Sequence, residues 1–406
     1  RRPPRSTLFP YTTLFRSSTF DIKHKRVLIR ADLNVPISDG VVQDDFRLRA
    51  LLPTLNYCLK NNAKIVLMSH LGRPKGKIDK KLSLMPIGEV LADLLEMPIK
   101  FSHHCVSEDA FNVTLGLKSG EIHLLENLRF SNDEVENNKD FSSKLAKHGD
   151  VFINDAFGTA HREHASNVGI IDHFSNRGMG FLIENEIQYF YKLINKPKKP
   201  LIVILGGSKV DSKLSLIDRF LNVADRIIIG GGMVFTFLKA QGKNIGNSIY
   251  QENLVSAAFD ILEKTKNTQK LVFPSDYICN TSFESKKKPV IYSKNEIKDG
   301  YMGLDIGPRS IKRFQSILND AETIFWNGPM GVFENENYEE GTKSLASSIV
   351  EFTEKGSKSI IGGGDSASAL RKYNLTKNVT HLSTGGGASL ELLSGKTLPA
   401  LQRLEI

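Results

Sequence analysis

Residues 184–213 read ENEIQYFYKLINKPKKPLIVILGGSKVDSK, and this stretch decides the fold. Its first part repeats apolar side chains at helical spacing, which predicts an amphipathic helix over 184–195. Pro197 and Pro200 end that helix, because proline lacks a backbone donor. Residues 201–205 form a continuous apolar run, typical of a strand buried on both faces of a parallel sheet. The run opens into a glycine loop that can approach an anion.

The same alternation of buried strand, polar or glycine-rich loop and helix lies on both sides of this stretch. A chain of 406 residues is also too long for one ordinary core. We therefore expect an α/β fold of two doubly wound parallel-sheet, Rossmann-like domains. The predicted parts are an N-terminal domain over 18–182, an interdomain helix and hinge over 183–200, a C-terminal domain over 201–393 and a closing segment over 394–406.

The first seventeen residues, RRPPRSTLFPYTTLFRS, contain two nearly repeated segments and no acidic residue. No methionine precedes Met68, so this stretch is typical of translated adaptor sequence. A signal peptide would need a longer apolar run and a cleavage site with small residues. We expect residues 1–17 to be a non-native or disordered leader.

The composition excludes several classes of protein. No apolar run approaches the ~20 residues of a membrane span, so we expect no membrane partner. The net charge is +9, but four of the arginines lie in the leader and the other basic residues are dispersed, which argues against nucleic acid. Cys58, Cys105 and Cys279 form no CxxC pair, which favours a reducing, cytoplasmic location.

The first predicted strand, over 27–35, has Asp32 and Asn34 on one face near its carboxyl end. Open α/β sheets bind ligands at that end of their strands. An isolated Asp-x-Asn before a proline is also a common turn former, so this pattern alone leaves both interpretations open.

Five basic side chains lie on or just beyond the ends of predicted strands in the first half of the chain. Any one of them alone would be typical of a solvated surface. Five at one edge of one sheet would repel one another unless a polyanionic ligand holds them together. They are Arg47, His70, Arg73, Arg129 and Arg162.

Two glycine-rich loops in the second half, GGGDS (362–366) and TGGGA (384–388), lead from a predicted strand into a helix. Free backbone N–H groups and the helix dipole favour an anion there. A nicotinamide-dependent oxidoreductase would also use such loops, but it should show GxGxxG with an acid about 20 residues later, and neither loop has that spacing. A non-catalytic binding protein is a second alternative, although it would not need Asp365 within a glycine loop.

Ten motifs resemble those of the phosphoglycerate kinase family, in order, over about residues 20 to 406. The first half contains KRVLIRADLNVP (25–36), SHLGRP (69–74), LLENLRF (124–130) and DAFGTAHR (155–162). The second half contains ILGGSKVDSK (204–213), IIIGGGMVFTF (227–237), GLDIGP (303–308), WNGPMGVFE (326–334), IIGGGDSASA (360–369) and STGGGASLELLSGK (383–396).

This resemblance implies reversible phosphoryl transfer from 1,3-bisphosphoglycerate to ADP, giving 3-phosphoglycerate and ATP, in glycolysis and gluconeogenesis. It implies Mg²⁺ as cofactor, ATP or ADP as co-substrate, and a cytoplasmic monomer. The N-terminal domain would bind 3-phosphoglycerate and the C-terminal domain the nucleotide, with the two facing each other across a hinge cleft. The segment 394–406 would return to the N-terminal domain.

The resemblance also implies roles for the residues of the first half. Asp32 and Asn34 would hold the hydroxyl and carboxyl end of the glycerate. The non-transferred phosphate would be bound by His70, Arg73, Arg129 and Arg162. Arg47 would reach the transferring group and would be catalytic together with Lys209 of the second half.

For the nucleotide, the resemblance implies contacts from Lys209, Lys213, Gly231, Gly232, Gly307, Asn327, Pro329, Glu334, Gly363, Gly364, Asp365 and Ser366. Three glycines would stabilise anionic oxygens, namely Gly364, Gly386 and Gly387. Asp365 would hold the magnesium ion. Ser366 departs from the threonine that is usual in the family, but it keeps a hydroxyl.

Overall fold

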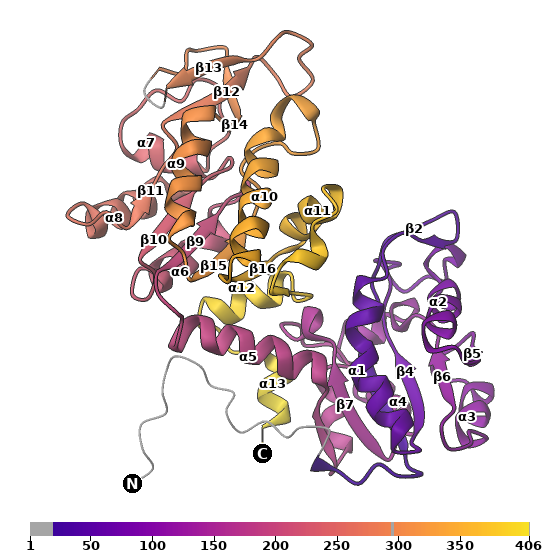
Figure 1. Cartoon of the computed structure of the whole chain (residues 1–406). Coiled ribbons are helices and arrows are strands. Elements are labelled where there is room, and N and C mark those ends of the chain that lie inside the picture. Colours follow the sequence, from indigo (N-terminus) through magenta and orange to yellow (C-terminus); the bar gives the residue numbers. More distant parts are fainter. Residues whose placement is uncertain (1–18, 294–295, 406) are drawn as a thin grey trace. The chain divides into compact units, whose positions relative to one another are not determined.

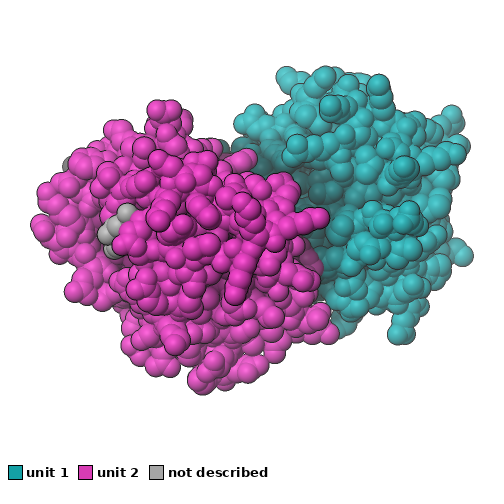
Figure 2. Space-filling view, turned by 90° about the horizontal axis from the view of Figure 1, so that it is seen from above, with its two compact units in different colours: residues 1–188, 397–406 teal, residues 189–396 magenta. Residues whose placement is uncertain are grey.

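The computed structural model describes residues 19–293 and 296–405 (Figure 1). These form two compact units (Figure 2). Unit 1 comprises the residues up to Gln188 and those from Thr397 onward, and unit 2 comprises Tyr189 to Lys396. The division falls inside helix α5 (Phe181–Asn195), which contains the helix predicted over 184–195. The predicted leader lies outside the described residues, and the hinge cleft stays a prediction.

Unit 1 is built on a six-stranded sheet in which every strand pair is parallel. Its spatial order is β5 (Ile99–Ser102), β6 (Ile122–Leu125), β4 (Lys64–Met68), β1 (Arg26–Ala31), β7 (Val151–Asp155) and β8 (Arg177–Met179). The chain proceeds from β1 to one side and later returns to β7 on the other. The carboxyl ends of β1 and β7 therefore form a switch point, where sheets of this kind bind ligands.

Helices and short turns surround this sheet. The helices of unit 1 are α1 (Phe46–Lys60), α2 (Met85–Leu95), α3 (Glu108–Leu115), α4 (Lys139–Ala146) and α13 (Pro399–Leu404). Its 3-10 turns are η2 (Lys80–Leu82), η3 (Leu128–Phe130), η4 (Asn132–Glu134), η5 (Phe157–Thr159) and η6 (Gly169–His173), and β2 (Ile37–Ser38) pairs with β3 (Val41–Val42). Helix α13 is attached through Ala400, whose N–H donates to the carbonyl of Ala160 at 3.2 Å.

Helix α1 shows how the sequence pattern places a helix on the sheet. It spans Phe46–Lys60. Apolar residues recur every three or four positions, so one face is buried and packs toward the strands, as Figure 1 shows for α1 and β4. These buried side chains are Leu48, Leu51, Leu55 and Cys58.

The first strand is shorter than the prediction of 27–35, because β1 ends at Ala31. The backbone leaves the ladder there, and the N–H of Leu33 donates instead to the hydroxyl of Ser69 at 2.9 Å. Asp32 and Asn34 consequently lie on the loop that follows β1, above the carboxyl end of the sheet.

Unit 2 repeats the architecture with a second six-stranded parallel sheet. Its spatial order is β11 (Leu271–Val272), β10 (Arg226–Ile229), β9 (Leu201–Leu205), β15 (Thr323–Asn327), β16 (Lys358–Gly362) and β17 (His381–Leu382). In chain order this is 3-2-1-4-5-6, the strand order of a dinucleotide-binding Rossmann sheet. The switch point lies between β9 and β15, where the glycine loop of residues 206–208 begins.

The helices of unit 2 are α6 (Asp211–Phe220), α7 (Val234–Ala240), α8 (Val255–Thr265), α9 (Pro308–Asn319), α10 (Glu340–Glu354), α11 (Gly364–Lys372) and α12 (Gly387–Leu393). Its 3-10 turns are η7 (Glu252–Leu254), η8 (Glu336–Tyr338) and η9 (Thr376–Asn378). An additional antiparallel sheet consists of β13 (Val290–Ser293), β12 (Asp276–Asn280) and β14 (Met302–Ile306). The sequence prediction did not include this sheet.

Candidate active site

The loops at the switch point of unit 1 are tied to one another by side-chain amides. Asn127 accepts a hydrogen bond from the N–H of Leu71 at 3.1 Å and donates to the carbonyl of the same residue at 2.7 Å. Arg129, two residues later on η3, donates from Nη1 to the carbonyl of Gly72 at 2.7 Å. These hydrogen bonds therefore hold the loop after β4 against the loop after β6.

A cavity of about 350 Å³ lies beside these loops. Three of the five predicted basic residues line it, Arg73, Arg129 and Arg162, together with His164. The Nε and Nη2 atoms of Arg129 are buried and have no hydrogen-bond partner among the described residues. Buried guanidinium donors without a partner are costly, so this cavity suits an anion that accepts from them.

The electrostatics of the site favour an anion as well. Burial, together with the charges of Arg30, Arg129, Arg47 and Arg162, holds the pKa of His70 well below its usual value. Burial and the neighbouring arginines also lower the pKa of Arg129 to about 10. Since each of these groups disfavours further positive charge nearby, a dianionic ligand would relieve the repulsion.

The other predicted residues of unit 1 have different surroundings. Asp32 is buried and forms an ion pair with Nη1 of Arg47. Asn34 is exposed, and its side-chain oxygen accepts from the N–H of Gly72 at 2.9 Å. His70 is buried and its Nδ1 lies 3.2 Å from Arg30. Of the five predicted basic residues, His70 and Arg47 do not line the cavity.

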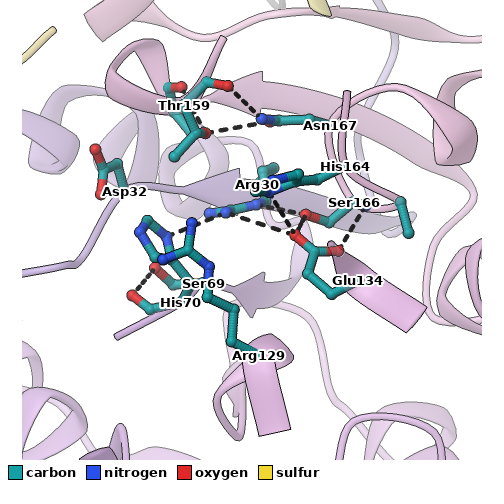
Figure 3. A network of polar contacts seen from close by, with 12 residues as sticks. Arg30, Asp32, Ser69, His70, Arg129, Glu134, Thr159, His164, Ser166 and Asn167 are labelled. Carbon is teal, nitrogen blue, oxygen red and sulfur yellow. Dashed lines mark hydrogen bonds and ion pairs between the residues drawn. The ribbon is translucent and has the colours of Figure 1, made fainter. Parts of the chain in front are cut away.

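Sequence reasoning missed a buried polar network below this edge, which Figure 3 shows in close view. Arg30, Glu134 and Ser166 are fully buried, and His164 is 7% exposed. The available signal was Arg30 itself, a charged residue within the apolar run of β1 and on the same face as Asp32.

Unit 2 contains a second cavity of about 350 Å³ at its own switch point. The loop after β9 is fixed to the loop after β15, because Gly207 N–H donates to the carbonyl of Pro329 at 2.7 Å. Gly231 lies so close that a Cβ on it would be 2.3 Å from the Gly207 nitrogen, and its φ is +62°. Only glycine fits at this position, and three backbone segments meet there.

The lining of this cavity is largely apolar and aromatic, and it includes four polar side chains. The apolar side chains are Phe235, Ile249, Tyr277, Phe283, Leu304, Met330 and Val332. The polar side chains are Ser208, Asp305, Glu334 and Asp365. A flat heterocycle with a charged extension matches this distribution, since aromatic walls stack on such a ring.

The predicted nucleotide residues fall into three groups. Those that line the cavity are Gly231, Gly232, Pro329, Glu334 and Asp365. Asn327, Ser366 and Gly363 brace the loops behind it: Asn327 Nδ2 donates to Gly362 at 2.8 Å and Ser366 Oγ accepts from Gly328 N–H at 2.6 Å. The remaining residues, Lys209, Lys213, Gly307, Gly364, Gly386 and Gly387, do not line the cavity.

Several of these remaining residues are explained by their own contacts. Gly307 precedes α9, and a Cβ there would lie 2.4 Å from the carboxyl carbon of Asp276, so it is packed within the protein. Gly386 has a φ of +51° at the start of α12, next to Gly387, and open space lies around it. Lys209 is exposed, two residues before α6 begins.

Lys213 lies near the cavity although it does not line it. Its Nζ is 3.2 Å from the position of a Cβ on Gly207, and the side chain is buried. Burial lowers the pKa of this ammonium, while the carboxylates of Asp365 and Asp211 oppose that change. A buried cation beside a glycine loop is well placed to contact an anion.

For a metal ion, Asp365 is the carboxylate that the cavity offers near the glycine loops. Among the described residues, no group of three or more His, Cys, Asp or Glu side chains could hold a metal by itself. A single carboxylate fits magnesium, which is commonly bound by one or two carboxylates plus substrate phosphates. Within the same part of the chain, no helix is both long and apolar enough to cross a membrane.

The comparisons with known proteins agree with one another. A family model described as phosphoglycerate kinase matches residues 17–396. The chain is 46% identical over 383 residues to the phosphoglycerate kinase of Fervidobacterium nodosum, covering 94% of this chain and 96% of that one. It is 43% identical over 389 residues to that of Rippkaea orientalis, with 96% and 97% covered.

The solved phosphoglycerate kinase of Coxiella burnetii has a TM-score of 0.84 and 35% identity, covering 96% of this chain and 98% of that one. These matches do not support the oxidoreductase alternative. They extend over both units, so they include the two cavities as well as the motifs. The chain therefore belongs to the phosphoglycerate kinase family.

Proposed function

We propose that this chain catalyses the reversible transfer of a phosphoryl group from 1,3-bisphosphoglycerate to ADP, giving 3-phosphoglycerate and ATP. The observation that carries the proposal is the cavity in unit 1, which three arginines line and where two buried donors of Arg129 have no partner among the described residues. A small, highly anionic substrate satisfies those donors.

In unit 1, Arg73, Arg129 and Arg162 bind the phosphate of 3-phosphoglycerate that is not transferred, and His70 donates to it. Asp32 and Asn34 hold the hydroxyl and carboxyl end of the glycerate. Arg47 is already ion-paired with Asp32, which places its guanidinium beside that end of the substrate. We assign Arg47 to the transferring group.

In unit 2, the aromatic and aliphatic walls of the cavity hold the adenine, and Glu334 accepts from the ribose. Lys213, Lys209 and the N–H groups of Gly364, Gly386 and Gly387 contact the phosphates. Asp365 would hold a magnesium ion, which when bound neutralises charge on the nucleotide phosphates. Gly307 supports this site indirectly, through its packing against Asp276.

The chemistry requires positioning and charge stabilisation rather than a covalent intermediate. Phosphoryl transfer spreads negative charge over the equatorial oxygens of the moving group, and fixed cations lower the energy of that state. The acyl phosphate is already activated and its carboxylate is a good leaving group. Arg47 and Lys209 are the cations that we assign to this role.

We also propose that the protein acts in the cytoplasm as a monomer. Three buried thiols without disulfide partners, Cys58, Cys105 and Cys279, fit a reducing compartment. Sedimentation of the purified protein tests the monomer, and a dimer would contradict it.

The decisive experiment for the function is a coupled assay of ATP- and Mg²⁺-dependent phosphorylation of 3-phosphoglycerate. We expect turnover with 3-phosphoglycerate and none with glycerate, which lacks the phosphate. The absence of turnover in a folded preparation, or equal activity with glycerate, would contradict the proposal.

A further inference from the structure

Glu134 is a carboxylate buried next to a site that we assign to an anion. It follows Arg129 by five residues and ends the 3-10 turn η4. Its two carboxyl oxygens both accept hydrogen bonds from Ser166, one from the N–H at 2.9 Å and one from the hydroxyl at 2.6 Å. Its backbone carbonyl accepts from the N–H of Ala165 at 2.8 Å. Glu134 therefore holds the segment that follows Arg162 and His164.

The Ser166 hydroxyl links Glu134 to Arg30 by two hydrogen bonds. Since the Ser166 hydroxyl donates to Glu134, its oxygen is free to accept from Nε of Arg30 at 2.7 Å. Nη2 of Arg30 also lies 4.0 Å from the Glu134 carboxylate, and Nη1 donates to the carbonyl of Ala31. Figure 3 shows these three side chains next to one another, joined by dashed contacts. Arg30 is fully buried and turned toward protein groups.

The contact between Arg30 and His70 fixes which ring nitrogen of His70 carries a proton. Nη2 of Arg30 lies 3.2 Å from Nδ1 of His70. A guanidinium can only donate, so Nδ1 must accept and carries no proton. Burial and the charges of Arg30, Arg129, Arg47 and Arg162 hold the pKa of His70 well below its usual value, which keeps the ring neutral. The single ring proton is then on Nε2, and that N–H is the donor that His70 can offer to a phosphate.

Burial of Glu134 raises its pKa, but Arg30 and the two Ser166 donors oppose this change. Because both oxygens accept hydrogen bonds, these contacts favour the charged form. A carboxylate here offsets the charge of Arg30, which otherwise would be an uncompensated cation in the interior. Arg30 can then act on His70 instead of binding the substrate itself.

We propose that Glu134 is a positioning residue of the phosphate site, which acts through Ser166 and Arg30 to fix His70 as a neutral ring that donates from Nε2. This inference rests on the proposed function, because it takes the substrate phosphate as the acceptor. The relay Glu134–Ser166–Arg30–His70 is nevertheless a property of the free protein and can be measured there.

The test compares E134Q and S166A with the wild type. The glutamine amide brings donors to a position where Ser166 already donates, and the alanine removes the hydroxyl that links Glu134 to Arg30. Long-range proton–nitrogen NMR of the free protein, assigned with H70Q, should show a single Nε2–H tautomer of His70 in the wild type. Both variants should show a mixture of tautomers.

In the coupled assay, both variants should raise KM for 3-phosphoglycerate by at least about tenfold and leave KM for ATP within about twofold. S166T keeps the hydroxyl and should retain the wild-type tautomer. E163Q removes an exposed carboxylate from the same loop and should change neither readout.

An unchanged His70 tautomer in S166A would overturn the relay, and this holds even if E134Q does not fold. Equal increases in KM for both substrates would also overturn it, because general loosening of the fold would then explain the effect. A wild type with the Nε2–H tautomer but no activity toward 3-phosphoglycerate would instead overturn the proposed function.

Discussion

Nη1 of Arg47 forms an ion pair with Oδ2 of Asp32, where the chain leaves β1. The Asp32 side chain is 5% exposed and that of Arg47 26%, so the pair is largely shielded from water. It connects the first turn of α1 to the loop after β1. A guanidinium held in this way is oriented before the substrate arrives.

We expect R47A to lower kcat about 100-fold, the usual effect of removing a fixed donor to developing charge. It should also lower the free energy of unfolding by about 1–3 kcal/mol, because Asp32 would remain buried and unpaired. Steady-state kinetics and urea unfolding measure the two effects. R49A is the matched control, since Arg49 lies on the same helix and pairs with Asp45 at the surface. Turnover of R47A within a few-fold of wild type would exclude Arg47 from catalysis.

Asp365 lies in the first turn of α11, but it does not cap that helix. The capping position belongs to Gly363, and no side-chain hydrogen bond caps the helix. D365A should therefore cost at most about 0.3–1 kcal/mol of stability, through the helix dipole. Its main effect should be a weaker response of activity to added Mg²⁺, measured as a magnesium titration at fixed ATP.

The control for D365A is E340A, which removes an exposed acid from the first turn of α10. It should match D365A in stability and leave the magnesium titration unchanged. If D365A responds to magnesium as the wild type does, the metal assignment is wrong.

The sequence was sufficient for the central strands of the two parallel sheets, such as β9, which are apolar runs that end in glycine or polar loops. It did not predict the edge strands β5 (IKFS) and β8 (RGM), which contain charged residues. It was not sufficient for Glu134, whose segment SNDEVENN is composed like a solvated loop. Only long-range packing against Ala165 and Ser166 buries it. The β12–β13–β14 sheet was missed because β12 (DYICN) and β14 (MGLDI) are not continuous apolar runs and β13 is largely exposed. Gly307 was identified from the motif GLDIGP. Its contact with Asp276 was not predicted, because Asp276 lies on β12 of that sheet.

Tyr277 lines the cavity of unit 2, and its buried hydroxyl has no hydrogen-bond partner among the described residues. An unsatisfied buried group costs about 1–3 kcal/mol, so Y277F should stabilise the free protein by about 1 kcal/mol. Thermal unfolding without nucleotide measures this gain. Y338F is the matched control, because the Tyr338 hydroxyl accepts from Asn280 at 3.0 Å and its loss should destabilise the protein. A loss of stability in Y277F would show that its hydroxyl is satisfied.

Two buried histidines in unit 1 form a chain of hydrogen bonds whose direction can be assigned. Nε2 of His148 lies 2.8 Å from the carbonyl of Cys105, so it must donate, and its Nδ1 accepts from the Thr114 hydroxyl at 2.7 Å. The Thr114 oxygen then accepts from Nδ1 of His123 at 3.0 Å. Nε2 of His123 accepts from Ser102 at 2.7 Å. Each ring nitrogen has one partner, and a proton added to either ring would require the Thr114 or Ser102 hydroxyl to stop donating to it.

The hydrogen-bonded histidines His123 and His148 make the stability of unit 1 sensitive to acid. Burial is the main cause that lowers the pKa of His123 to about 3, and His148 and Lys100 add to it. Burial also lowers the pKa of His148 to about 4, and Arg26 adds to this, although the hydrogen bond to the Cys105 carbonyl opposes it. Both values lie below the ~6.5 of an unfolded histidine, so the unfolded chain binds more protons. The stabilisation is complete above pH ~6.5 and is lost as the pH falls toward 3–4, by up to ~1.4 kcal/mol per pH unit for each ring.

We expect urea midpoints measured between pH 7 and pH 5 to fall steeply in the wild type and less steeply in H123Q/H148Q. The glutamines can hydrogen-bond but do not titrate, so the difference in slope reports the two protons directly. H24Q is the control, because His24 is an exposed histidine that bonds Ser119 at the surface. It should leave the slope unchanged. Equal slopes in the wild type and the double variant would mean that other groups cause the acid sensitivity.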